Sequence, residues 1–166
     1  NYQLAAAWNR VHSDRFFTKI HLSYGAYRAE QIDPEGNDAF ALRNGLNNVK
    51  LKIDNVLSVG TAHALRIGAE GSQYFAKPEA LRPLSDISVF LPEQVSKDNG
   101  REFAVYAQDE ITVSKRISIS LGSRYSYYQN LGPRTVWYYE QGQPRETLSV
   151  RDSAVFGQGE VITSYG

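Results

Sequence analysis

The chain has 166 residues, a balanced charge of 18 Lys or Arg against 18 Asp or Glu, and no cysteine. The lack of cysteine excludes a disulfide framework and a thiolate metal site, and the balanced charge argues against a nucleic-acid partner, which needs clustered cations. No apolar run approaches the ~18 residues of a membrane-spanning helix, but 11 Tyr, seven Phe and two Trp fit a soluble all-β domain or a membrane β-barrel segment.

Apolar and polar residues alternate with period two, the pattern of a half-buried strand, in six separate runs. In chain order these runs lie at residues 2–9, 16–26, 49–59, 65–72, 103–113 and 117–128. No window longer than about ten residues keeps a helical period. The sequence therefore predicts an all-β fold, an antiparallel meander of about six long strands.

The connections between these runs alternate between short and long. The short ones lie at residues 12–15, 60–63 and 114–116, and the long ones at about 29–46, 77–100 and from 129 onward. Outer-membrane barrels have tight periplasmic turns and long extracellular loops, so we expect the six strands to form part of a transmembrane β-barrel. A soluble β-sandwich that binds carbohydrate or protein through aromatic loops is the alternative.

The pairing register of the 49–75 hairpin follows from charge. In an antiparallel hairpin the numbers of two directly opposed residues add up to a constant. A constant of 124 would place Asp54 opposite Glu70, and two like charges destabilise a cross-strand pair. A constant of 122 places Lys52 opposite Glu70 and closes the turn over residues 60–62. We therefore predict Lys52 opposite Glu70, as a structural bridge in the sheet.

Three stretches carry a family resemblance. Residues 63–70 read HALRIGAE, residues 102–111 read EFAVYAQDEI, and residues 121–132 read LGSRYSYYQNLG. In this order and spacing they resemble the barrel strands of TonB-dependent outer-membrane receptors, especially those of Bacteroidetes-type bacteria. The resemblance covers most of residues 45–132.

The resemblance implies a barrel of about 22 strands with an N-terminal plug, which imports a scarce ligand such as a siderophore, a glycan or a peptide. Its partners would be outer-membrane lipid, the rest of the barrel and the plug, the TonB complex acting through that plug, and a surface lipoprotein. The chain shows no plug-like region and no TonB box. We therefore expect residues 1–166 to be a single internal segment of a barrel wall.

Charged and amide side chains gather on the polar faces of the predicted strands: Lys50, Lys52, Arg66, Glu70, Glu102, Gln108, Glu110 and Arg124. We interpret them as a hydrated lumen wall that contacts the plug, with a ligand path as the sharper alternative. Among loop residues, the aromatic side chains of Trp137, Tyr138 and Tyr139 are the candidates for ligand contact, because exposed rings stack on sugars and cover apolar ligands.

No catalytic set is expected. The three histidines lie in no metal-binding or triad motif, so we predict neither an enzyme nor a metal or cofactor site.

Three polar residues interrupt the alternation. Asp109, Asn55 and Arg10 have sequence positions that put them on the apolar faces of their strands. Asp109 either faces lipid or is turned inward by a β-bulge. Residues 135–140 and 145–150 form either a further pair of barrel strands, closing eight strands, or an extracellular hairpin, which we prefer.

Overall fold

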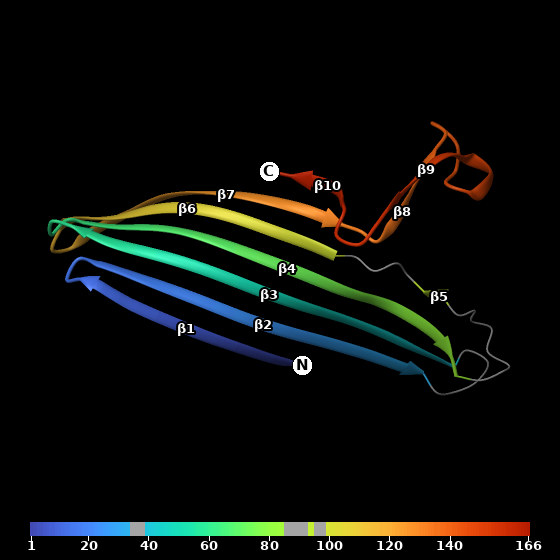
Figure 1. Cartoon of the computed structure of the whole chain (residues 1–166), viewed down its shortest axis with the longest axis horizontal. Helices are drawn as coiled ribbons and strands as arrows, with labels where there is room; N and C mark the ends of the chain where they lie inside the picture. Colours follow the sequence, from blue (N-terminus) through green and yellow to red (C-terminus); the bar gives the residue numbers. More distant parts are fainter. Residues whose placement is uncertain (34–38, 85–92, 95–98) are drawn as a thin grey trace.

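The computed structural model describes residues 1–33, 39–84, 93–94 and 99–166, and its dominant feature is one antiparallel sheet. The strands follow in the order β1-β2-β3-β4-β6-β7-β10, with β5 paired to β4 and with β8 and β9 forming a separate two-stranded sheet. Their bounds are β1 (Tyr2–Ser13), β2 (Phe16–Asp33), β3 (Phe40–Val59), β4 (His63–Pro83), β5 (Glu93–Gln94), β6 (Asn99–Ser114), β7 (Ile117–Leu131), β8 (Arg134–Tyr139), β9 (Val150–Phe156) and β10 (Val161–Tyr165). Figure 1 shows the long strands side by side in a single layer. The predicted antiparallel meander is confirmed, with a seventh strand, β10, added next to β7.

The short turns gather at one end of the sheet. The β1–β2, β3–β4 and β6–β7 turns lie together at the left of Figure 1, and the longer connections lie toward the opposite end. The β3–β4 turn spans residues 60–62, as predicted. Gly60 has a positive φ of 64°, a conformation that glycine adopts without a steric penalty.

The predicted register of the β3–β4 hairpin is confirmed. Lys52 lies directly opposite Glu70, Ile53 opposite Ala69, and Leu57 opposite Leu65. This register therefore places Leu51, Ile53 and Leu57 on the same face as Leu65 and Ala69, whereas a slip by one residue would move that set to the other face.

Burial in the sheet is confined mainly to small side chains. The buried hydrophobic residues among those described are Ala26, Ala39, Ala41, Ala104 and Leu131. A soluble sandwich would bury the inner faces of two sheets packed about 10 Å apart, and the described residues form no second layer of that kind. The eight-strand closure also fails within the described ranges, because β1 and β10 are the unpaired ends of the strand order.

The strands are longer than the sequence predicts, so the expected long connections at 29–46 and 77–100 are wrong in extent. β2 continues to Asp33, which pairs with Phe40 at the start of β3, and β4 continues to Pro83. Cross-strand contacts such as the ion pair from Arg43 Nε to Glu30 Oε1, at 2.5 Å, hold these ends together. The sequence of these ends does not keep the alternation of polarity seen in the central segments, which is why the pattern misses them. Residues 34–38, within the first of these expected connections, lie outside the described residues.

The preference for a separate hairpin over two further barrel strands is confirmed, with one arm misplaced. β8 pairs with β9, and both project away from the long sheet in Figure 1. The second arm begins at Val150, because residues 140–149 form a turn that ends in a 3₁₀ segment at Thr147–Ser149. Within the described ranges, no helix is long and apolar enough to cross a membrane.

Candidate functional site

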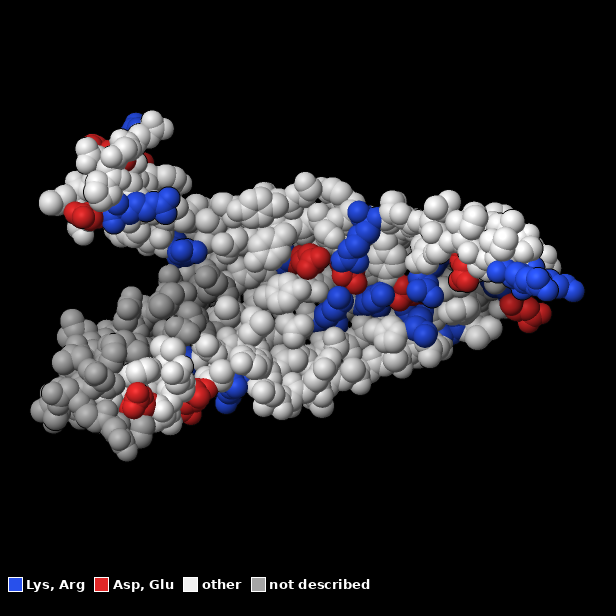
Figure 2. Space-filling view, turned by 180° about the vertical axis from the view of Figure 1, so that it is seen from behind, with Lys and Arg blue, Asp and Glu red and all other residues white. Residues whose placement is uncertain are grey.

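The charged side chains gather over the middle of one face of the sheet (Figure 2). The cross-strand pairs explain why, since Lys52, Glu70, Ala104 and Ser126 form one row across four strands. The next rows contain Asp54, Gly68, Tyr106 and Arg124, and then Val56, Arg66, Gln108 and Gly122. All eight predicted polar-face residues lie in these three rows or in the two rows that adjoin them. Lys50 and Glu102 lie in one adjoining row, and Glu110 lies in the other, nearer the short turns and opposite Ala64 and Ser120.

Glu70 is the centre of an ion-pair chain. Its carboxylate accepts from Arg124 and lies 3.3 Å from Lys50 Nζ, and its side chain is only 9% exposed. Arg124 also reaches Glu102, with 3.4 Å between Nη2 and Oε1. The chain thus joins β3, β4, β6 and β7 through side chains that alternate in charge.

The predicted bridge from Lys52 to Glu70 is wrong, although the two residues are directly opposed. Lys52 Nζ instead lies 3.6 Å from Asp54 Oδ2 on its own strand. Glu70 is shared by Lys50, a diagonal neighbour, and by Arg124, two strands away. Arg124 crosses β6 where Ala104 lies opposite Glu70, and the methyl side chain of Ala104 leaves room for the guanidinium.

Tyr106 and Asp54 belong to the same site, although they were not among the predicted site residues. The Tyr106 hydroxyl donates to Asp54 Oδ1 at 2.5 Å, and Asp54 is only 8% exposed. The Tyr106 ring crosses β4 at Gly68, where an added Cβ would overlap the ring. An aromatic residue directly opposite a glycine is a known signature of such a crossing, so the Gly68–Tyr106 pair was a usable signal once the register was set.

The structure decides which way Asp109 points. The β6–β7 ladder is regular from Asn99 to Thr112, and its irregularity lies beyond, between Thr112 and Ser114. Asp109 is therefore opposite Leu121 and shares the apolar face. It is paired there: His63 Nδ1 lies 2.7 Å from Asp109 Oδ2, while Oδ1 is buried without a hydrogen-bond partner in the described structure.

Asn55 is also paired on the apolar face. Thr18 Oγ1 donates to Asn55 Oδ1 at 2.8 Å, and His12 Nε2 lies 3.0 Å from the same hydroxyl. These three side chains come from adjacent strands. Hydrogen bonding to each other lowers the cost of placing polar groups on an apolar surface.

The aromatic candidates on the β8–β9 hairpin do not form one surface. Trp137 is 52% exposed and lies opposite Ser153, whereas Tyr138 is 49% exposed and lies opposite Asp152. Successive strand residues point to opposite faces, so Tyr138 lies on the other face of the hairpin from Trp137. Tyr139 is half-buried.

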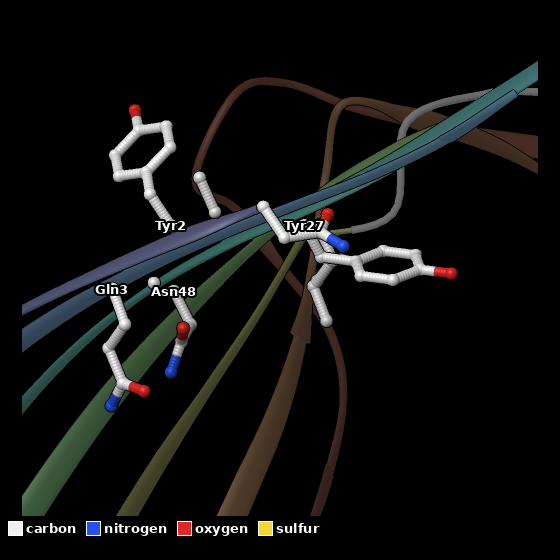
Figure 3. A pocket seen from close by; sticks show the side chains of 8 residues that line it. Tyr2, Gln3, Tyr27 and Asn48 are labelled. Atoms are coloured by element: carbon white, nitrogen blue, oxygen red, sulfur yellow. The ribbon is translucent and has the colours of Figure 1, made fainter.

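A hollow of about 470 Å³ lies at the free edge of the sheet, near the start of β1. Figure 3 shows the amides of Gln3 and Asn48 reaching to one side and the ring of Tyr2 to the other. Its lining contains no Lys, Arg, Asp or Glu, and the neighbouring edge of β1 is unpaired in the strand order. It therefore offers no charged anchor for a ligand.

Comparison with known proteins gives one family. The family model described as TonB dependent receptor-like, beta-barrel matches residues 1–158. No curated protein and no solved structure matches the chain.

Proposed function

Because the chain belongs to the family of TonB-dependent receptor β-barrels, we propose that it forms part of the barrel wall around the import path of a receptor for a scarce ligand. Membership of the family supports a position in the wall of a receptor barrel in the bacterial outer membrane. Members of the family are transporters rather than enzymes, and they work with a plug domain and TonB. The ligand is a siderophore, a glycan or a peptide.

One observation supports this role most directly: the two faces of the single-layered sheet differ in chemistry. Large apolar side chains such as Leu51, Val105 and Leu121 are exposed on one face. The opposite face holds the ion-pair chain of Lys50, Glu70 and Arg124. A barrel strand alternates in this way, because one face meets lipid and the other meets a polar interior.

In this arrangement the eight polar-face residues belong to the lumen wall, beside the plug. Residues 1–166 are one segment of the barrel, and the plug is a separate domain of the receptor. The apolar face contacts outer-membrane lipid, and the projecting hairpin is the part of the segment best placed for a surface lipoprotein.

Trp137 is the proposed ligand contact at the outer end. Its ring is exposed on a hairpin that projects away from the sheet at the end opposite the short turns. Tyr138, on the other face of the hairpin, and the half-buried Tyr139 are the secondary candidates. An exposed indole stacks on sugar faces or covers an apolar ligand.

Uptake measurements test the import role. Cells carrying the full-length receptor would be offered labelled ferric siderophores, oligosaccharides and peptides in separate assays. We expect one class to be taken up in a TonB-dependent manner, and Trp137→Ala to lower that uptake. Leu148→Ala is the matched control, because Leu148 is 97% exposed on the same hairpin. No receptor-dependent uptake of any class would contradict the proposal.

Labelling of intact cells tests the orientation. A cysteine at Gln143, in the turn beyond β8, should react with an impermeant maleimide, and a cysteine at Asp14, in the β1–β2 turn, should not. The reverse pattern would overturn the assignment of the short turns to the periplasm. The corresponding position in the 77–100 connection, Ser85, lies outside the described residues.

A further inference from the structure

The charged face contains a hollow of about 350 Å³ between β3, β4, β6 and β7. Three of the side chains that line it are cationic, namely Lys52, Arg66 and Arg124. Among the described residues, no Asp or Glu lines it. The volume falls in the range of small-ligand sites, about 300–1,000 Å³, so the hollow is large enough for a charged group of modest size.

The carboxylates nearest to this hollow already have partners. Asp54 accepts from Tyr106 and lies beside Lys52, and Glu70 is held between Lys50 and Arg124. Glu102 has two partners as well, since Arg124 Nη2 and the Tyr74 hydroxyl each lie 3.4 Å from its carboxylate. Lys52 and Arg124 therefore balance carboxylates that lie outside the lining, while they themselves line the hollow.

Arg66 has no such partner. Within the part of the chain that the structure describes, it makes no ion pair and no hydrogen bond. A guanidinium presents a planar fork of donors that matches a carboxylate or a phosphate in two-point contact. Arg66 therefore supplies an unused donor set in a hollow whose two other cations, Lys52 and Arg124, are each ion-paired with carboxylates outside the lining.

The rest of the lining keeps the hollow open and rigid. Gly122 lies in the same row as Arg66 and Gln108, and a Cβ there would come within 3.2 Å of Gln108 Cβ. Tyr106 is fixed by its bond to Asp54, with Lys52 Nζ 5.3 Å from its ring centroid. Because the Tyr106 ring is held in place and Gly122 has no side chain, the site has a preformed shape, which lowers the free-energy cost of binding.

We propose that this hollow binds an anionic oxygen group, a carboxylate or a phosphate, with Arg66 as the main contact and Lys52 and Arg124 at its sides. The inference rests on the proposed function, because it requires this face to line the lumen. Two sources can supply the anion: an acidic side chain of the plug, or an acidic group on a solute that passes along the wall.

The test uses the full-length receptor in lipid vesicles and reads individual residues by mass spectrometry. Phenylglyoxal, which modifies arginine, is applied with and without inorganic pyrophosphate, and the rate at Arg66 is compared with the rate at Arg116. Arg116 is the matched control, because it lies in the β6–β7 turn, away from the hollow. In a parallel sample, a carbodiimide joins amines to carboxylates that contact them, which reports any plug carboxylate beside Lys52.

If the anion is a solute, pyrophosphate at about ten times its Kd should slow modification of Arg66 about tenfold, since roughly a tenth of the sites stay free. Arg116 should be unaffected. If the anion belongs to the plug, Arg66 should react slowly without pyrophosphate, and the carbodiimide should link Lys52 to a plug Asp or Glu. The inference is overturned if pyrophosphate gives no protection and no link to the plug forms, whatever the rate at Arg66.

A cysteine at Ile67 separates this result from a failure of the proposed function. Ile67 is the neighbour of Arg66 on the opposite face and is 59% exposed on the isolated sheet. In a barrel wall it faces lipid and should not react with an impermeant maleimide. Rapid labelling of Ile67→Cys would show that the apolar face is not in a membrane, and would count against the barrel wall itself.

Discussion

The two faces of the long sheet use opposite means to accommodate polar groups. On the polar face, long side chains reach across strands and share carboxylates, as Arg124 does with Glu70 and Glu102. On the apolar face, the polar groups are few and bond to each other, as His63 and Asp109 do. Charge is distributed through a network where water has access, and is neutralised locally where the surrounding medium is apolar.

The polar pairs of the apolar face also lie at particular positions along the strands. His63 is the first residue of β4, directly after the short turn, and His12 and Thr18 flank the β1–β2 turn. A polar side chain on the lipid face costs much less near the interface than at the midplane. The polar pairs of the apolar face therefore lie toward the end of the sheet where the cost of placing them is lower.

Charge placed in the middle of the apolar face should have the largest effect. Leu22 is 51% exposed on that face, and its neighbour Ser23 lies on the polar face, opposite Lys50. Leu22→Arg should lower the free energy of unfolding by about 2–4 kcal/mol, the cost of an arginine near the bilayer midplane. Ser23→Arg should cost less than about 1 kcal/mol, from like charge across the strands.

The measurement is guanidinium unfolding of the full-length receptor in lipid vesicles, followed by fluorescence. Equal losses for these adjacent positions would mean that the two faces do not meet different media.

Removing the charge of Glu70 should have the next largest effect. Glu70→Gln leaves Lys50 and Arg124 without their shared carboxylate, and we expect a loss of about 1–3 kcal/mol in the free energy of unfolding. Glu110→Gln is the control, because Glu110 is exposed and makes no ion pair with another described residue. A surface change of that kind should stay within about 0.5 kcal/mol. The same unfolding assay compares the two variants, and similar losses would show that Glu70 is not the centre of the network.

On the apolar face, His63 and Asp109 should depend on each other for their contribution to stability. His63→Leu leaves Asp109 without its partner and should cost about 1–2 kcal/mol. The double variant His63→Leu with Asp109→Leu should recover most of that loss, because replacing both partners by apolar groups is nearly neutral. A double-mutant cycle of thermal unfolding measures the coupling. A double variant less stable than His63→Leu alone would point to a further partner of Asp109.

The smallest effect distinguishes the two lysines near Glu70. Glu70→Lys should recover more stability when combined with Lys50→Glu than with Lys52→Glu, because Lys50 is in ion-pair contact with Glu70 and Lys52 is not. The difference should be about 0.2–1 kcal/mol, the size of a cross-strand pair. Thermal unfolding of the two double variants measures it. Better recovery with Lys52→Glu would restore the bridge that the register alone suggested.

The strands, their faces and the register of one hairpin could be predicted from the sequence, because these depend on a local period of two. Avoiding Asp54 opposite Glu70 was enough to place Lys52 there. The outer ends of β2, β3 and β4 were missed, because their sequences do not keep the alternation of the central segments. β10 was missed as well, because its five residues are too few to show a pattern.

The contacts between side chains of the site could be identified only from the tertiary structure. The sequence placed Lys50, Glu70 and Arg124 on polar faces, but the ion pair from Glu70 to Arg124 spans β6. Likewise, the bond from Tyr106 to Asp54 crosses β4 at Gly68. Periodicity specifies which face a side chain occupies and which residue lies opposite. A long side chain that crosses a neighbouring strand depends on the room left by the small residue beneath it, and therefore on how the strands are assembled in space.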